Sequence, residues 1–297
     1  MRSPLNKRLF RELRGEFGKY LVIFILMTLT IGMVSGFLVA DGSMIQAYEE
    51  SFEKYNIENG HFRTEKKMNN AQIQDIEDLG IKLYENYYVE EVLTNGSTMR
   101  ISKNRDEVNK VCLMKGKMPE KPGEIGIDRM YADNNDLSVG DEIESGGHTW
   151  KITGLVALSD YSALFSDNND SMFDSVKFGV SVVCPEEFDS YKADQLNYSY
   201  AWKYNTEPKN EKAEKDISED LMEDVAKEVT LEEFVPRYTN QAIIFTGDDM
   251  GGDRSMMIVL LYIIIVIMAF VFAITTSNTI RKEANVIGTL RASGYTR

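Results

Sequence analysis

Residues 255 to 277 read SMMIVLLYIIIVIMAFVFAITTS, a long apolar run without a single charged side chain. Residues 20 to 40, YLVIFILMTLTIGMVSGFLVA, form a second uncharged run near the other end of the chain. As α-helices rising about 1.5 Å per residue, each run would cover about 30 Å, the thickness of the bilayer hydrocarbon core. A buried helix of a soluble protein is the alternative, but uncharged runs above about 18 residues are typical of transmembrane helices. We therefore expect two spans, with residues 41 to 254 between them.

Charge divides the chain in the same way. Ten of the 33 basic residues and three of the 47 acidic ones lie within residues 1 to 19 and 278 to 297. The other 23 basic and 44 acidic residues lie between Asp41 and Arg254, a net charge of -21. Because Lys and Arg beside a span are retained in the cytoplasm, we expect a cell-membrane protein with both termini cytoplasmic and residues 41 to 254 extracytoplasmic. So acidic a domain would repel nucleic acid phosphates, which excludes nucleic acid as a partner.

The residues before the first span have helical periodicity. Within residues 1 to 19, Leu5, Leu9 and Leu13 share one face, and most basic residues lie off it. This pattern predicts an amphipathic helix on the inner membrane surface, and an ordinary solvated start to the span is the alternative. A cleaved signal peptide is a further alternative for the first apolar run. The first apolar run is longer than the apolar region of a signal peptide, which is usually about 7 to 15 residues.

Small side chains recur every fourth residue in the first span. Such a stripe lets another helix approach closely in lipid, so it is a candidate packing face for a neighbouring helix or a second copy. The stripe consists of Thr28, Gly32, Gly36 and Ala40.

The central region has the patterns of a mixed α and β domain. Residues 44 to 56 have helical spacing and predict a stalk helix that continues the first span outward. Helices are also expected at 69 to 79 and 210 to 229, and the fold class is α+β with two lobes as one form it could take. Strands are expected within residues 82–93, 97–101, 110–114, 124–128, 149–158, 175–184 and 196–204.

Residues for chemistry are scarce. The two histidines, His61 and His148, cannot build a histidine-rich metal site and are expected on strands or at the surface. Residues 167 to 178 start like a calcium loop, but Met172 and Phe178 replace its turn glycine and its bidentate Glu. No nucleotide-binding P-loop and no G-x-S-x-G nucleophile motif is present. We therefore expect no catalytic residue, no metal site and no cofactor in this chain.

The two cysteines would both lie outside the cytoplasm, where a disulfide is permitted. Cys112 and Cys184 each sit in an apolar strand-like run, which favours two buried free thiols over a bridge. The sequence alone leaves the pairing open, since it does not give the distance between their Cα atoms.

The segment after the second span carries a recognisable motif. Residues 278 to 297 read NTIRKEANVIGTLRASGYTR, with a charged turn followed by I-G-x-L-R-A-x-G. This resembles the segment after the second helix of FtsX-like (MacB-like) ABC transporter permeases, although EAN stands where many members have a Glu-rich stretch. The segment also reads as a short amphipathic helix on the cytoplasmic membrane face. The matching residues are Arg281, Lys282, Glu283, Ile287, Gly288, Leu290, Arg291, Ala292 and Gly294.

Residues 114 to 165 carry a second likeness, to the extracytoplasmic core of MacB-like proteins. The likeness consists of a G-K-x-P turn, the strand at 124 to 128, a helix containing Ala132, L-x-V-G-D at 137 to 141, and the strand at 149 to 158. None of these residues has an evident catalytic role.

The resemblance implies a permease subunit that is not itself an ATPase. Its partner would be an ABC ATPase docking at Arg281, Lys282, Glu283, Ile287, Gly288, Leu290 and Arg291, with membrane lipid around the spans and a homodimer or a second permease half beside it. The resemblance implies further spans, so this sequence is expected to be a fragment or half of a split permease. A regulator of a cell-wall hydrolase and a two-span extracytoplasmic receptor are the alternatives. Cargo and transport direction stay open.

Overall fold

The computed structural model describes residues 14 to 294, which form two compact units. One unit consists of the apolar helical segments before Ala47 and after Asp248, and the other is the folded unit Ala47–Asp248. Of the amphipathic helix predicted within residues 1 to 19, the first 13 residues lie outside the described part of the chain.

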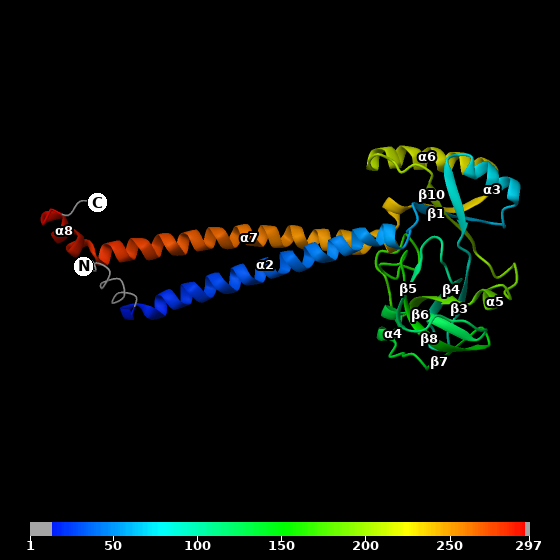
Figure 1. Cartoon of the computed structure of the whole chain (residues 1–297), viewed down its shortest axis with the longest axis horizontal. Helices are drawn as coiled ribbons and strands as arrows, with labels where there is room; N and C mark the ends of the chain where they lie inside the picture. Colours follow the sequence, from blue (N-terminus) through cyan, green and yellow to red (C-terminus); the bar gives the residue numbers. More distant parts are fainter. Residues whose placement is uncertain (1–13, 295–297) are drawn as a thin grey trace. The chain divides into compact units, whose positions relative to one another are not determined.

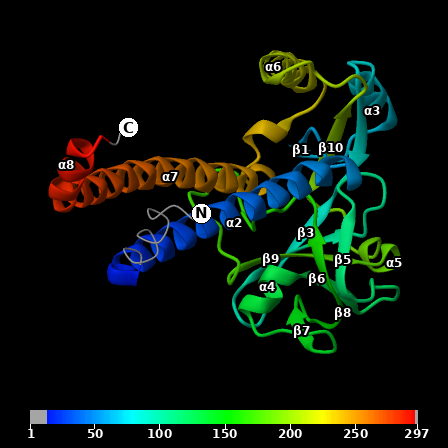
Figure 2. The same ribbon diagram turned by 60° about the vertical axis from the view of Figure 1, so that its left-hand side comes forward.

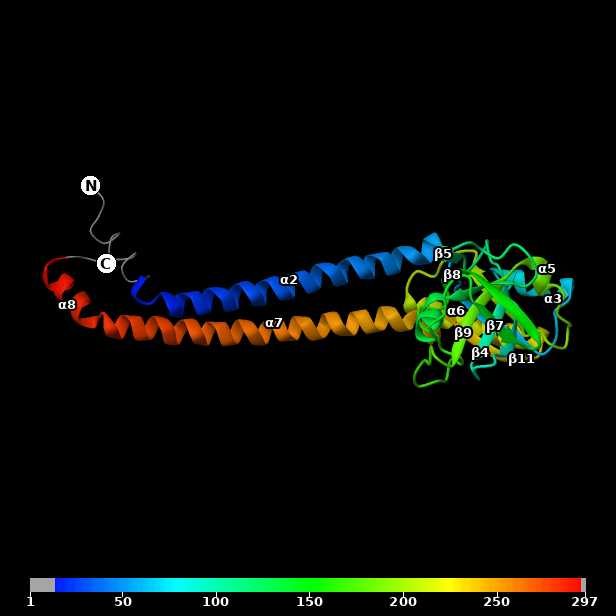
Figure 3. The same ribbon diagram turned by 90° about the horizontal axis from the view of Figure 1, so that it is seen from below.

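The apolar unit is built from two long helices (Figure 3). Helix α2 is Phe17–Lys54 and helix α7 is Gln241–Lys282, and both are long and apolar enough to cross a membrane. Within the described residues, their apolar side chains are almost all exposed or half-buried, unlike those of a core helix in a soluble protein. Helix α2 continues past the first apolar run, as the predicted stalk requires. Helix α7 begins well before residue 255, which the sequence did not predict.

The small-residue stripe on α2 is open. A Cβ atom added at Gly32 or Gly36 would meet nothing within 4 Å, and Thr28 and Ala40 are exposed. Among residues 14 to 294, no side chain fills this face. The stripe is therefore available to a helix from outside the described chain.

The folded unit contains two separate β-sheets. The first is antiparallel, in the order β11-β1-β10-β2, and helices α3 and α6 lie together on one side of it (Figure 1). Helix α3 begins with a capping box in which Asn69 and Gln72 satisfy each other's backbone N–H groups. The elements are β1 Gly60–Thr64, α3 Asn70–Glu77, β2 Ile81–Glu85, β10 Tyr198–Tyr204, α6 Glu211–Glu228 and β11 Leu231–Pro236.

The second sheet is larger and mixed. Its order is β3-β4-β9-β6-β8-β5, with β7 paired to β8. The pairs β4–β9 and β6–β8 are parallel and the others are antiparallel. Figure 2 shows these strands gathered below β1, β10 and α3. The elements are β3 Tyr88–Val92, β4 Thr98–Lys103, β5 Val111–Gly116, β6 Glu124–Asp128, α4 Arg129–Asn134, β7 Glu142–Ser145, β8 His148–Leu158, β9 Phe178–Val183 and α5 Pro185–Phe188.

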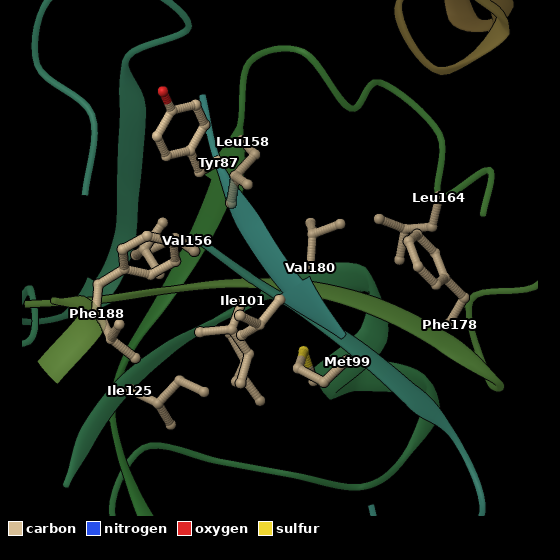
Figure 4. Packing of buried hydrophobic residues seen from close by; sticks show 14 of the residues in the cluster. Tyr87, Met99, Ile101, Ile125, Val156, Leu158, Leu164, Phe178, Val180 and Phe188 are labelled. Atoms are coloured by element: carbon tan, nitrogen blue, oxygen red, sulfur yellow. The ribbon is translucent and has the colours of Figure 1, made fainter. Parts of the chain in front are cut away.

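Both sheets contribute to one apolar core. Met99, Ile101, Ile125, Val156 and Val180 are buried in the second sheet, where their side chains converge (Figure 4). In the first sheet the aromatic rings of Phe62, Tyr200, Trp202 and Phe234 pack against one another across neighbouring strands. The α+β class predicted from the sequence is confirmed.

Most predicted elements are present. The helices expected at 69 to 79 and 210 to 229 are α3 and α6, and the helix expected around Ala132 is α4. The run at 82 to 93 divides at Asn86 and Tyr87 into β2 and β3, which belong to different sheets. Strands β1, β7 and β11 escaped prediction because they are short and carry many polar residues.

Candidate functional site

The motif segment forms a separate short helix. Helix α7 ends at Lys282, and α8, Ala284–Ala292, starts after a single break at Glu283. Gly294 closes α8 in the left-handed region with φ 87°, a conformation that glycine adopts without a Cβ penalty. The predicted helix is thus present, and its glycine has a structural reason to be there.

Most of the predicted coupling residues are accessible. Arg281, Ile287, Gly288 and Arg291 are exposed, whereas Glu283 and Leu290 are half-buried. The Lys282 ammonium donates to Glu16 Oε1 at 2.6 Å, and Glu16 also accepts from Lys19 at 3.0 Å. The segment from Arg281 to Arg291 therefore exposes both basic and apolar side chains. Its role in docking an ATPase stays a prediction.

The other end of α7 is held by a loop of the folded unit. The Gln241 backbone N–H donates to Asn168 Oδ1 at 2.9 Å, and the Gln241 side chain donates to the Asn168 carbonyl. Ser162 Oγ donates to the Ile243 carbonyl at 2.9 Å, and Thr246 Oγ1 donates to the Ser162 carbonyl at 3.1 Å. These hydrogen bonds anchor the first turns of α7 to the segment after β8.

The outer end of α2 is held by a different loop, the one between β4 and β5. The Asn109 side chain accepts from the Glu58 backbone N–H at 2.9 Å and donates to Glu58 Oε2 at 2.6 Å. The Lys110 N–H donates to the Tyr55 carbonyl at 2.9 Å. Asn109 has a positive φ of 49°, which asparagine tolerates better than most residues.

A buried ion pair joins these two loops. The Arg105 guanidinium contacts both Asp160 oxygens, at 2.7 and 2.9 Å, and the two side chains are only 9% and 7% exposed. Burial would lower the pKa of Arg105, but the Asp160 carboxylate more than offsets it and raises that pKa. The bidentate geometry fixes both position and orientation. The ends of α2 and α7 within the folded unit are therefore each held by a loop, and the Arg105–Asp160 pair joins the two loops. The residues of this arrangement are here called the stalk link: Tyr55, Glu58, Asn109, Arg105, Asp160, Ser162 and Asn168.

The folded unit also contains a polar cavity of about 590 Å³. Its walls come from β1, β3, β4 and the segment from Asp160 to Phe178, with Asn240 and Ala242 at the start of α7. On one wall, Arg100 donates to Glu90, to the Tyr161 hydroxyl at 2.6 Å and to the Ser166 carbonyl at 2.8 Å.

The environment of Arg100 is largely closed to water. Its guanidinium lies 4.4 Å from the centre of the Tyr88 ring and 5.0 Å from that of Phe178. Burial raises the pKa of Tyr161 to about 12, against the opposing effect of Arg100. The phenol therefore stays a neutral hydrogen-bonding group at physiological pH.

The histidines and cysteines occupy structural positions. His61 on β1 lies 2.6 Å from Glu58 Oε1, and His148 on β8 is exposed, so both lie on strands as predicted. Cys112 and Cys184 are both free thiols, one half-buried on β5 and one buried after β9. No group of three or more potential metal ligands occurs within residues 14 to 294.

Sequence reasoning identified the motif segment at 278 to 297, whose role in coupling stays a prediction, but missed the stalk link and the cavity. Their residues come from loops that lie far apart along the chain and belong to no motif. The one signal was the run of acids and amides at 167 to 171, which resembles the start of a calcium loop.

Comparison with protein-family models found no match, and neither did comparison with curated proteins. Among solved structures, the chain is similar to the periplasmic region of MacB from Actinobacillus actinomycetemcomitans, at 12% identity and a TM-score of 0.32, over 58% of this chain and 86% of that one. It is likewise similar to the extracellular domain of the ABC-type transporter YknZ from Gram-positive bacteria, at 11% identity and a TM-score of 0.32, over 58% of this chain and 100% of that one. At these values, membership of a family stays a proposal.

Proposed function

We propose that the chain is a permease subunit of an FtsX-like or MacB-like ABC transporter. It would couple ATP hydrolysis by a separate ATPase in the cytoplasm to motion of the extracytoplasmic domain. The observation that supports this most directly is the continuity of α7. One unbroken helix starts at Gln241, where the folded unit holds it, and ends beside α8, which carries the motif Ile-Gly-x-Leu-Arg-Ala-x-Gly.

The dimensions suit such a coupling. A helix of 42 residues is about 63 Å long, and the hydrocarbon core takes up only about 30 Å of that length. The remainder would extend beyond the membrane as a stalk. Hydrogen bonds along the helix make it stiff, so a displacement at Lys282 would move Gln241 as well. Lipid would cover the exposed apolar faces, and the open stripe on α2 would pack against a second copy or a second permease half.

The docking claim is tested with an ABC ATPase, and one encoded beside this chain would be the first candidate. Arg291→Glu and Arg281→Glu should each reduce co-purification of the ATPase and the stimulation of its activity by about tenfold or more, because a repulsive charge would replace a pairing one. Arg291→Lys retains the charge and should lose much less.

Lys212→Glu, an equally exposed charge reversal on α6, is the matched control and should leave both readouts unchanged. The proposal would be wrong if the α8 reversals bound and stimulated the ATPase as well as the unmodified chain does.

A further inference from the structure

The floor of the 590 Å³ cavity is the polar face of the first sheet. Arg63 on β1 lies opposite Ser199 on β10 and opposite Glu233 on β11, which places the three side chains in one row across the strands. The facing wall belongs to the second sheet and carries the rings of Tyr88 and Phe178. The volume lies within the range of small-molecule sites, roughly 300 to 1,000 Å³.

Two largely buried side chains in this cavity, Ser199 and Asn240, each have a polar atom without a hydrogen-bond partner among the described residues. Ser199 is only 5% exposed, and its hydroxyl makes no hydrogen bond to any residue that the structure describes. Asn240 is also 5% exposed; its Oδ1 accepts from the Ala242 N–H, but its Nδ2 has no partner between residues 14 and 294. Neither atom is fully buried by the described residues, so each is open to the cavity, where a polar occupant would pair with it.

The charges around the cavity leave a negative excess. Four of its carboxylates have basic partners: Glu58 with His61, Glu90 with Arg100, Asp160 with Arg105, and Glu233 with Arg63. The remaining acids all lie on the segment after β8, and the only unpaired basic residue in the described lining is Lys177. These acids are Asp167, Asp170 and Asp174.

Asp167 and Asp174, which are exposed, each retain a carboxylate oxygen without a hydrogen bond within the described chain. Asp174 uses Oδ1 to accept from the Val176 and Lys177 backbone N–H groups, and Asp167 uses Oδ1 for Asn169. The second oxygen of each carboxylate has no hydrogen bond within the described chain. A positively charged donor would satisfy these oxygens with charge-assisted hydrogen bonds.

We propose that this cavity binds a small organic cation carrying a primary amine or a guanidinium group. The cationic group would pair with the acids of the 167 to 174 segment, and its polar remainder would reach Ser199 and Asn240. The occupant would also contact Asn168, which holds the first turn of α7. Binding of this ligand does not require an ATPase partner, so the binding experiment tests the site independently of the permease proposal.

The test uses the full chain in detergent micelles, titrated calorimetrically with agmatine, which carries both a primary amine and a guanidinium. The neutral analogue 1-butylurea serves as the comparison ligand. Agmatine should bind saturably and 1-butylurea should not. Raising the salt concentration should weaken agmatine binding, because screening reduces the attraction between exposed charges.

Asp174→Asn keeps the Oδ1 acceptor for the backbone and removes the charge, so agmatine should bind about tenfold more weakly. Asp167→Asn is the second variant, should Asp174→Asn unfold. Ser199→Ala should keep the unfolding temperature of the ligand-free chain, because an unpaired hydroxyl is lost, yet weaken agmatine binding about fivefold. Glu219→Gln, an exposed acid on α6, should bind agmatine like the unmodified chain.

Three results would overturn the proposal. One is the absence of saturable agmatine binding to the unmodified chain up to about 10 mM, a range well above most small-ligand affinities. Another is equal weakening by Glu219→Gln and Asp174→Asn, which would indicate unspecific attraction to an acidic surface. The third is equally tight binding of 1-butylurea.

Discussion

At the residue scale, the Arg105–Asp160 pair has more structural consequence than any exposed ion pair. The two side chains are nearly inaccessible to water and make two parallel hydrogen bonds. A charge left alone at such a site retains its full desolvation cost. The pair also connects the two loops that hold α2 and α7, so its loss would reach beyond its own contacts.

We predict that Asp160→Ala lowers the free energy of unfolding of the full chain by about 3 to 5 kcal/mol, because it leaves the Arg105 charge buried and unpaired. Arg129→Ala is the matched control, since its pair with Asp133 is 53% and 59% exposed and should contribute at most about 1 kcal/mol. Chemical unfolding in detergent measures both. Similar losses for the two variants would contradict the role assigned to the buried pair.

The Glu58–His61 pair predicts a pH dependence. Burial alone would lower the pKa of His61, but the carboxylate 2.6 Å away more than offsets it and raises that pKa above 6.5. Burial alone would raise the pKa of Glu58, but His61 and Asn109 lower it below 4.5. The stabilisation by His61 is complete below pH 6.5 and is lost as the pH rises through the raised pKa. That by Glu58 is complete above pH 4.5 and is lost as the pH falls through the lowered pKa.

We therefore expect the unfolding free energy contributed by this pair to be greatest between pH 4.5 and 6.5 and to fall on the alkaline side. In His61→Gln the decline above pH 6.5 should be smaller than in the unmodified chain, since Gln does not titrate. Thermal unfolding over a pH series provides the comparison. Parallel curves for the two proteins above pH 6.5 would rule out His61 as the titrating group.

At the scale of elements, the first turns of α7 contact the outer turns of α2 within the folded unit. The Tyr48 hydroxyl donates to the Ile243 carbonyl at 3.0 Å. A Cβ atom added at Gly247 would lie 2.5 Å from the Tyr48 ring, whereas one added at Gly251, a turn further along α7, would meet nothing within 4 Å. The helices can therefore come this close only because residue 247 has no side chain.

Two matched alanine substitutions follow from this difference. Gly251→Ala should raise the free energy of unfolding by about 0.5 to 1 kcal/mol, because alanine favours the helix over glycine. Gly247→Ala gains the same helix preference but forces the Tyr48 ring aside, so we expect a net loss of about 1 to 3 kcal/mol. Unfolding in detergent compares the two. Stabilisation by both substitutions would show that the two helices separate at this point without cost.

At the scale of the whole molecule, the distribution of charge and the two apolar runs together predict the orientation in the membrane. The net charge of -21 lies between two uncharged runs whose outer flanks are basic. Each loss of a flanking Lys or Arg should weaken the predicted preference for cytoplasmic termini, since retention depends on basic residues near the span.

A reporter fused after Arg297 tests the orientation. Green fluorescent protein at this position should fluoresce, because it matures in the cytoplasm, whereas alkaline phosphatase there should stay inactive. The same reporters inserted in the 146 to 147 turn of the folded unit should show the opposite pattern. Active phosphatase at the C-terminus would place the basic flank outside and exclude docking of a cytoplasmic ATPase at α8.

The sequence by itself determined the elements whose signals are local. Hydropathy adds up along 20 to 40 and 255 to 277, helical periodicity marks α3 and α6, and the α8 motif lies within one contiguous segment. Residues that are close in sequence are also close in a helix or a strand, so these patterns needed no knowledge of the fold.

Tertiary structure alone decided the pairing of Arg105 with Asp160, the row formed by Arg63, Ser199 and Glu233, and the early start of α7 at Gln241. The row follows from the strand order β11-β1-β10, in which neighbours in space are distant in sequence. Loops have no periodicity that could reveal their partners. Their contacts exist because burial of the two sheets in one core brings them together, and a long-range effect of this kind leaves no pattern in a linear sequence.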